Sequence, residues 1–232
     1  AFTNRDFYRG GEFDAKGVNR GGTFDSAKAT QAYFDMFKRF DYPVYPALAD
    51  ASLTKPGLGF WAVDFQKGDF MRYGMGGVIW VNEIREEYFG HDIYLLPGQS
   101  LAEHRHLPTH IKVKDQWTGK EFEKDLPCKM ESWLVRHGWV YGFTTEGEPN
   151  LDQFPEAKAN LSSLLWDQKA NKPVNLKSLH VEKWVPDGIA HKLPKVGTWH
   201  FMMGGTEGAI ITEFANFHDS KCNRFSVPGV VF

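Results

Sequence analysis

The 232-residue sequence predicts an all-β fold of the sandwich or jelly-roll type, preceded by an N-terminal helical extension. From Gly59 onward, short runs rich in β-branched and aromatic residues alternate with glycine, proline and asparagine, which is the pattern of strands and turns. A single long segment shows convincing helical periodicity, so a doubly wound sheet with alternating helices is disfavoured. Aromatic residues make up 15% of the chain, which suits strands packed around a β-rich core.

The N-terminal part of the chain is expected to form an arm followed by one helix. Residues 1–24 are rich in Gly, Arg and Asp and indicate an arm or loop. Asp25 or Ser26 suits the N-cap of a helix over roughly 26–39. That helix carries an apolar stripe suited to packing on a sheet, at positions i, i+1, i+4 and i+7: Tyr33, Phe34, Phe37 and Phe40.

The rest of the chain is expected to form a barrel from many short strands. The segments that indicate strands are Phe60–Phe65, Val78–Ile84, Asp92–Leu96, His104–Val113, Ser132–His137, Val140–Thr144, Leu179–Val185, Trp199–Met203 and Ala209–Phe217. The polar segment 147–177 indicates a loop that contains a short helix near Glu156–Trp166. We therefore expect an arm and helix over 1–58 and a barrel over 59–232, together making one domain.

Composition limits the classes of function. The formal charge of −2 and the isoelectric point near 6.5 argue against a general nucleic-acid or anionic-membrane surface. No run approaches the roughly 20 apolar residues of a membrane span. Two cysteines, Cys128 and Cys222, do not make a disulfide scaffold in a chain of this length, so a reducing, cytoplasmic location is expected.

Three histidines in two segments form the main candidate for a metal site. His104 and His106 are spaced i, i+2, so on a strand both imidazoles project from the same face and can reach one ion. His191 follows a turn of the form Pro186-x-Gly188 and can complete a set of nitrogen donors. Imidazole donors without thiolates favour Mn, Fe, Ni, Co or Zn.

These segments resemble the two motifs of the cupin superfamily. Gly98 and five further residues lead to His104-Arg105-His106, and the closing half of the first motif reappears as Glu131, six residues and Gly138. The second motif matches Pro186-x-Gly188-x-x-His191, with Lys195 where an asparagine is usual. The resemblance covers about residues 90–217, with an insertion over roughly 107–130.

The cupin resemblance implies a jelly-roll β-barrel that binds one divalent metal through His104, His106, Glu131 and His191. Glu103 and His110 are the alternatives should Glu131 not take part. Three imidazoles and one carboxylate leave open positions on an octahedral ion, as is needed to polarise a substrate oxygen.

Two further features resemble the D-lyxose (D-mannose) ketol-isomerase branch of the cupins. A lysine precedes the metal-binding glutamate by two residues, in Lys129-Met130-Glu131. A late strand ends in Gly208-Ala209-Ile210-Ile211-Thr212-Glu213 and is followed by Asn223-Arg224-Phe225. This resemblance implies that Glu213 is the acid/base and that Lys129 assists proton movement. The chain departs from the branch by its insertion and by Cys222, where an acidic residue is expected.

The implied reaction interconverts a free aldose and its ketose through a cis-enediol, as in D-lyxose/D-xylulose or D-mannose/D-fructose. It requires a base with a working pKa near neutrality, a group that moves the hydroxyl proton, and a cation, with manganese placed first. We expect the apolar strand around Glu213 to raise its pKa, and the metal to push Lys129 towards its neutral form.

Two further residues and the binding partners complete the prediction. Alternation places Trp133 on the face of Glu131, where it would line the cavity or belong to the core. Arg224 would bind sugar hydroxyls or hold the C-terminal turn. The chain has no evident phosphate-binding loop, which favours a neutral sugar over a sugar phosphate as the small-molecule substrate. The protein is expected to be a homodimer.

Two alternatives remain open on the sequence. Three histidines and a glutamate also suit an Fe(II)-dependent dioxygenase, which would need oxygen and would have no use for Lys129 and Glu213. A carbohydrate-binding cupin with a structural metal would show no turnover. Fold alone does not separate these possibilities.

Overall fold

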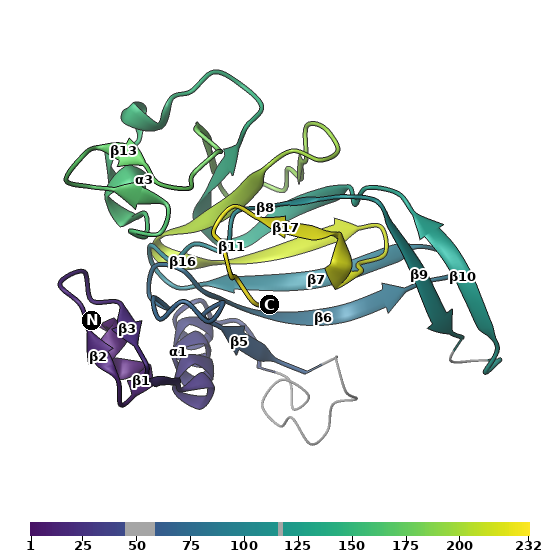
Figure 1. Ribbon diagram of the computed structural model, residues 1–232, viewed down its shortest axis with the longest axis horizontal. Coiled ribbons are helices and arrows are strands. Elements are labelled where there is room, and N and C mark those ends of the chain that lie inside the picture. The colour runs from purple at the N-terminus through teal and green to yellow at the C-terminus, as the bar shows by residue number, and fades with distance from the viewer. Residues whose placement is uncertain (45–58, 116–117) are drawn as a thin grey trace.

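The computed structural model describes residues 1–44, 59–115 and 118–232. Its main element is a curled sheet of nine described strands, in which every paired strand runs antiparallel to its neighbour (Figure 1). Its strands are β5 (Trp61–Val63), β6 (Met75–Glu83), β7 (Tyr88–Leu95), β8 (His104–His106), β11 (Glu131–Thr144), β14 (His180–Trp184), β15 (His191–Lys192), β16 (His200–Ala215) and β17 (Asn223–Phe225). The predicted all-β class is confirmed.

The two longest strands lie side by side at the centre of the sheet. β11 and β16 each join two segments that the sequence predicts as separate strands. Gly138 marks a register shift rather than the end of β11. Its backbone lies in the left-handed region at φ 67°, and a Cβ there would collide with the carbonyl of Gly208 on the facing strand. Glycine therefore bends this strand pair without ending it.

Short strands fold over the inner face of the sheet and close the barrel. β8 pairs with β16 where His104 faces His200, and it pairs along its length with β17. The sheet follows the order β14-β11-β16-β7-β6-β5, with β8, β15 and β17 joined to its sides. This arrangement brings the inward side chains of β8 towards those of β11 and β16.

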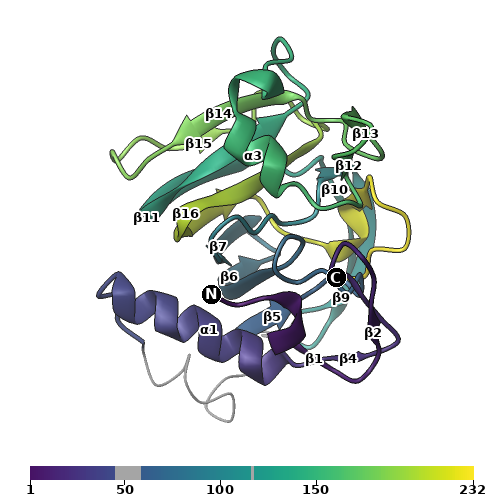
Figure 2. The same ribbon diagram turned by 90° about the vertical axis from the view of Figure 1, so that its left-hand side faces the viewer.

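The N-terminal helix α1 (Ser26–Arg39) packs on the outer face of the sheet, as Figure 2 shows on the β5–β7 side. Asp25 caps it by accepting a hydrogen bond from the Lys28 amide at 3.0 Å. Tyr33 and Phe37 are fully buried, whereas the two other members of the predicted stripe are only partly buried. The predicted helix and its cap are confirmed.

The predicted N-terminal loop contains short paired strands. β1 (Tyr8–Arg9) pairs with β4 (Thr23–Phe24), and β2 (Glu12–Phe13) pairs with β3 (Asn19–Arg20) after the 3-10 turn η1 (Asn4–Asp6). The predicted boundary at residue 58 lies outside the described residues, so the division into arm and barrel stays a prediction.

The polar segment after β11 is mostly irregular, with a helix shorter than predicted. It holds η3 (Leu151–Gln153), α3 (Pro155–Asn160), β12 (Trp166–Asp167) and β13 (Lys172–Pro173). The helix ends early because Leu161 is extended and the Ser162 hydroxyl bonds the buried carboxylate of Asp69 at 2.6 Å. A further 3-10 turn, η4 (Ser220–Cys222), precedes β17.

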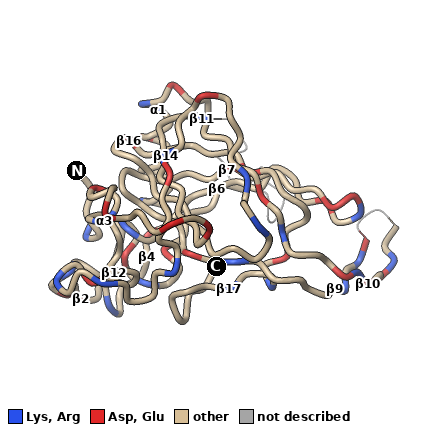
Figure 3. Tube along the Cα trace, turned by 90° about the horizontal axis from the view of Figure 1, so that it is seen from above, with Lys and Arg blue, Asp and Glu red and all other residues tan. Residues whose placement is uncertain are grey.

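The insertion at 107–130 forms a separate hairpin of β9 (Thr109–Lys114) and β10 (Glu121–Leu126). It extends away from the barrel in Figure 1, and Figure 3 shows charges of both signs along it. Pro108 interrupts the predicted strand over His104–Val113, because proline supplies no amide hydrogen to a sheet. No helix within the described residues is long and apolar enough to cross a membrane.

Candidate metal centre and active site

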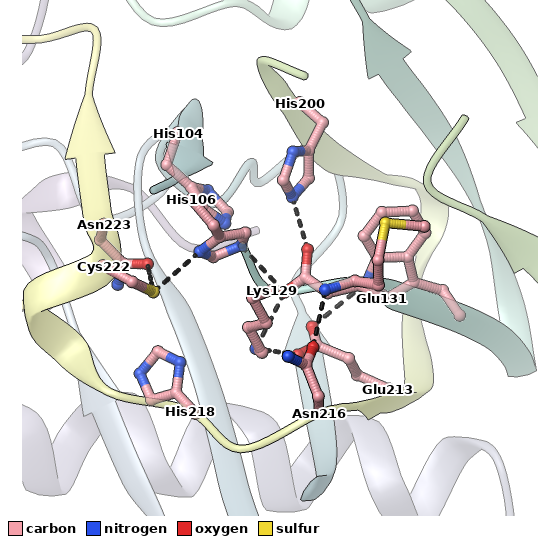
Figure 4. Close-up of polar contacts among 12 residues, drawn as sticks. His104, His106, Lys129, Glu131, His200, Glu213, Asn216, His218, Cys222 and Asn223 are labelled. Atoms are coloured by element: carbon pink, nitrogen blue, oxygen red, sulfur yellow. Dashed lines mark hydrogen bonds and ion pairs between the residues drawn. The ribbon is translucent and has the colours of Figure 1, made fainter. Parts of the chain in front are cut away.

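Four side chains from three strands meet in the barrel: His104, His106, Glu131 and His200 (Figure 4). One potential ligand atom from each lies within 4.8 Å of the others. His104 and His106 project from β8, Glu131 begins β11, and His200 begins β16. We call these four residues the His3Glu group.

Contacts on the outer side of each imidazole fix how the histidines face the group. Nδ1 of His104 lies 2.7 Å from the Ala102 carbonyl, and Nδ1 of His200 lies 2.8 Å from the Thr198 carbonyl. A carbonyl only accepts, so Nδ1 carries the hydrogen in both rings and Nε2 keeps its lone pair. Such contacts typically orient histidines that bind metals.

His106 has a different outer partner. Its Nδ1 lies 3.3 Å from the Cys222 sulfur, whose thiol hydrogen points to the Asn223 side-chain oxygen at 3.5 Å. The sulfur can therefore accept from Nδ1–H, which again leaves Nε2 with a lone pair. Cys222 stands where the sequence resemblance leads one to expect an acidic residue.

The His3Glu group fits a divalent cation. Nε2 of His106 lies 3.0 Å from Oε1 of Glu131, and Nε2 of His200 lies 2.8 Å from Oε2. Both Nε2 atoms and Oε2 are buried without a hydrogen bond of acceptable geometry. When Nε2 carries a lone pair, imidazole and carboxylate are both acceptors, and one cation between them satisfies them together. Three nitrogens and a carboxylate without thiolate match the donor set of Mn, Fe, Co, Ni or Zn.

Burial and charge act in opposite directions on the three histidines. Burial lowers the pKa of His104 and of His106, which keeps these imidazoles free to donate a lone pair. Burial also opposes the charged form of His200, but the Glu131 carboxylate outweighs it and raises that pKa. A proton and a metal ion therefore compete for Nε2 of His200.

The structure does not bring the predicted ligand His191 to the group. His191 lies on β15 at the edge of β11, where its ring stacks on Trp184 with centroids 4.5 Å apart and planes at 11°. His200 occupies the fourth position instead. The pattern Gly-x-x-His occurs twice in this region, ending at His191 and at His200, so the signal for His200 was present. Only the pairing of β16 with β8 distinguishes the two histidines.

Lys129 joins the His3Glu group to Glu213. Its Nζ donates to Oε1 of Glu131 at 2.9 Å and to Oε1 of Glu213 at 2.7 Å. Trp133 donates from its indole nitrogen to the other Glu213 oxygen at 3.1 Å. Lys129 is only 3% exposed, and its ammonium group lies 4.3 Å from the centre of the Phe89 ring. The sequence thus named Lys129, Glu213 and Trp133, and the structure brings them together.

The environment shifts the pKa of both catalytic candidates. Burial, followed by the negative charge of Glu131, raises the pKa of Glu213 to about 7. The direction is as predicted, but Phe214 contributes little because it faces outward and is half exposed. Burial opposes the charge on Lys129, yet the carboxylates of Glu131 and Glu213 outweigh it and raise its pKa. The two carboxylates thus favour the charged form of Lys129, whereas a metal bound beside it would favour the neutral form.

The other candidates take structural positions. Arg224 is exposed and donates to the carbonyls of Lys221 and Asn223, both at 2.8 Å, so it holds the C-terminal turn. The Glu103 carboxylate accepts hydrogen bonds from the backbone amides of Lys177 and Ser178. His110 contacts Glu123 and Asp125 on the hairpin, away from the group.

One cavity connects these residues. The His3Glu group, Lys129, Glu213 and Trp133 line its polar part, and aromatic residues such as Trp61 and Phe225 line its apolar part. Two histidines that the sequence did not single out, His91 and His218, also line it. The cavity therefore places a prospective metal, a carboxyl group with a pKa near 7 and a charged lysine around one space.

Comparison by sequence finds related isomerases. No protein-family model matches the chain. It is 26% identical over 198 residues to the D-lyxose/D-mannose isomerase of Thermosediminibacter oceani, covering 83% of this chain and 92% of that protein. It is 27% identical over 170 residues to the D-lyxose ketol-isomerase of Cohnella laeviribosi, covering 72% of this chain and 75% of that protein.

Comparison by structure finds the same fold in L-ribose isomerases. The enzyme of Cellulomonas parahominis, solved with L-ribose, superposes with a TM-score of 0.51 at 11% identity and 87% coverage of this chain and 90% of that one. The enzyme of Acinetobacter sp. DL28, also with L-ribose, gives 0.52 at 10% identity, covering 88% and 91%. The sequence comparisons confirm the predicted resemblance to the D-lyxose ketol-isomerases. The structural comparison shows that this chain shares the fold of the L-ribose isomerases.

Proposed function

We propose that this protein is a metal-dependent isomerase that interconverts a free aldose and its ketose, of the D-lyxose/D-xylulose or D-mannose/D-fructose type. The observation that carries the proposal is the buried Lys129 ammonium group, which bridges Glu213 and the metal-binding candidate Glu131. The named relatives in both comparisons are sugar isomerases, which supports the aldose–ketose class.

Glu213 suits the transfer of a proton between neighbouring carbons. Its carboxylate would take the proton from C2 of the aldose and return it to C1, so that both transfers occur on one face of a cis-enediol. A pKa near 7 balances the fraction present as base against the strength of the acid that must return the proton. Hydrogen bonds from Lys129 and Trp133 hold the carboxylate in a fixed orientation while it acts.

Lys129 suits the handling of charge and of the hydroxyl proton. Removal of the C2 proton gives an enediolate, which carries its negative charge on the oxygens of C1 and C2. A charged ammonium group next to these atoms would stabilise that charge and pass a proton between the oxygens. Because Lys129 is buried between two carboxylates, its position requires no reorganisation during the reaction.

The His3Glu group would hold the cation. His104, His106, Glu131 and His200 would bind one divalent ion, with manganese proposed first and Fe, Co, Ni or Zn as the other choices. When bound, the ion supplies positive charge that stabilises the enediolate. An iron-dependent dioxygenase would have no role for the Lys129–Glu213 pair, so an isomerase accounts for the residues of the site better.

The physiological setting is part of the proposal. We propose a cytoplasmic homodimer that acts on an unphosphorylated sugar. Cys128 and Cys222 are both free thiols, which suits a reducing compartment. Sedimentation of the purified protein tests the dimer.

The experiment that tests the function is a proton-NMR screen of free aldoses. Each sugar is incubated with Mn-loaded protein, with air excluded. Appearance of D-xylulose from D-lyxose, or of D-fructose from D-mannose, is the expected result. No ketose from any aldose, together with turnover only when iron and oxygen are supplied, would support the dioxygenase instead.

A further inference from the structure

Two histidines line the cavity but have no part in the proposed proton transfer: His91, which is buried, and His218, which is half-buried. His91 lies on β7 directly opposite Glu213 on β16, so the two side chains share the inner face of the sheet as neighbours. His91 is only 7% exposed, and its Nε2 has no hydrogen-bond partner among the described residues. Its ring lies against Trp61, with centroids 5.5 Å apart.

The absence of a side chain at Gly77 creates the space for His91. A Cβ on Gly77 would lie 2.8 Å from Nε2 of His91, which is closer than the Cβ atoms of real proteins approach other atoms. Glycine at position 77 therefore leaves room for the imidazole beside Ile79, which lies directly opposite His91 on β6. Burying a ring nitrogen without a hydrogen-bond partner is unfavourable, so a ligand that bonds to Nε2 of His91 would remove this cost.

The backbone of His218 is fixed by two hydrogen bonds to the Asn82 side chain. Its amide donates to the Asn82 side-chain oxygen, and the Asn82 side-chain nitrogen donates to its carbonyl, both at 2.9 Å. Its ring packs on Phe89 at 5.4 Å, and Phe89 contacts His91 at the same distance. Nδ1 of His218 is buried and has no partner among the described residues. In Figure 4 the His218 ring lies on the side of the cluster remote from His200.

Both imidazoles are uncharged at neutral pH. Burial, and after it the positive charge of Lys129, lowers the pKa of His91 to about 3 and that of His218 well below its usual value. A neutral imidazole offers one N–H donor and one acceptor nitrogen. A sugar hydroxyl group likewise donates once and accepts, so the two kinds of group are complementary.

We propose that His91 and His218 bind the hydroxyl groups of the sugar beyond its two reacting carbons, and so set the length and configuration of the substrate. This inference rests on the proposed function, because the reacting carbons must lie between Glu213 and the His3Glu group. His91 adjoins Glu213, and His218 lies beyond Phe89, so the next carbons of an extended sugar chain would pass these two rings. The ligand class is an acyclic polyhydroxy chain of five or six carbons.

The test uses a polyol that cannot be isomerised. D-arabinitol carries the hydroxyl pattern of reduced D-lyxose and has no carbonyl group, so its binding is independent of catalysis. Binding to Mn-loaded protein is measured by calorimetry for wild type, His91→Phe, His218→Phe and His218→Gln. His137→Phe is the matched control, because His137 lies outside the cavity and packs on Phe40.

The expected result is that each phenylalanine variant weakens arabinitol binding about tenfold, the typical effect of losing a hydrogen bond to a buried group. His218→Gln should restore most of the affinity, and the control should bind like wild type. Metal content and melting temperature, measured in parallel, establish that each variant is folded and loaded. Unchanged binding in both phenylalanine variants, an equal loss in the control, or no binding of arabinitol to wild type would overturn the inference.

A kinetic comparison separates this inference from the proposed function. D-glyceraldehyde has the reacting carbons but only one hydroxyl group beyond them, so its conversion to dihydroxyacetone should depend far less on His91 and His218 than that of D-lyxose. A rise of KM for D-lyxose without a similar rise for glyceraldehyde supports the assignment. Histidine-dependent binding of arabinitol by a protein that isomerises no sugar would contradict the proposed function alone.

Discussion

Nζ of Lys129 lies 2.7 Å from Oε1 of Glu213, and the same ammonium group lies 2.9 Å from Oε1 of Glu131. One buried cation thus connects the carboxylate proposed to move a proton with the carboxylate proposed to bind a metal. Two buried carboxylates this close would repel each other without the lysine. Lys129 thus connects the proposed proton transfer at Glu213 with the proposed metal binding at Glu131. Single substitutions test each of the two roles.

Replacing Lys129 with methionine should remove this connection while keeping the length of the side chain. We expect kcat for D-lyxose to fall by about 10²–10⁴, the usual contribution of an acid–base group. The variant should also melt at a lower temperature, because its two buried carboxylates lose their partner. Steady-state kinetics and thermal unfolding measure the two effects. Wild-type kcat in a folded Lys129→Met protein would exclude a catalytic role.

The two candidate histidines His200 and His191 make a matched pair. His200→Ala should lose bound metal, because its Nε2 belongs to the His3Glu group. His191→Ala should keep it, because that ring stacks on Trp184 instead. Metal content after dialysis, measured by mass spectrometry, distinguishes them. Loss of metal in His191→Ala with retention in His200→Ala would reverse the assignment and restore the ligand that the sequence motif suggests.

Cys222 is expected to support metal binding through His106. Cys222→Val would leave Nδ1 of His106 without its outer partner, whereas Cys222→Ser keeps an acceptor in the same place. Loss of such an outer contact typically reduces metal affinity 10–100-fold. Competition with a chelator gives the affinity of each variant. Equal affinity in the valine and serine variants would show that the sulfur contact is incidental.

His91 should make stability depend on acid. Its folded pKa, lowered to about 3, lies below the unfolded value of about 6.5. The stability that a neutral His91 contributes is therefore complete above pH 6.5 and is lost as the pH falls from there towards 3. His91→Gln should flatten this decline by one proton, or about 1.4 kcal/mol per pH unit in the steep range. Urea unfolding at pH 7, 5 and 4 measures it, and identical slopes would contradict the assignment.

Local features of the sequence were sufficient for the elements that depend on local interactions. The helix over roughly 26–39 was predictable, because Asp25 or Ser26 could supply a cap and the aromatic stripe has helical spacing, and Asp25 is the cap in the structure. Most strands of the sheet were found, but the short strands β15 and β17 were not, and two long strands were divided at glycines such as Gly138. A glycine that ends a strand and one that bends it look alike until the facing strand is known.

The site shows the same division. His104, His106 and Glu131 were predictable because motif spacing constrains them, and Lys129 and Glu213 followed from their resemblance to known isomerases. The choice of His200 over His191 depends on which strand pairs with β8, which no local pattern encodes. Likewise, Lys129 is charged and buried because carboxylates from two strands enclose it. His91 and His218 belong to no motif, and only the folded barrel brings them to the cavity.

The central claim is that Glu213 carries a proton between C1 and C2 of a bound sugar. The most direct measurement is deuterium exchange into D-lyxose in D₂O, followed by NMR with Mn-loaded wild type and Glu213→Gln. We expect wild type to place deuterium at C2 of recovered D-lyxose or at C1 of D-xylulose. The variant should retain its metal and show exchange reduced by at least about 10². Exchange at the wild-type rate in a folded, metal-loaded Glu213→Gln protein would contradict the account.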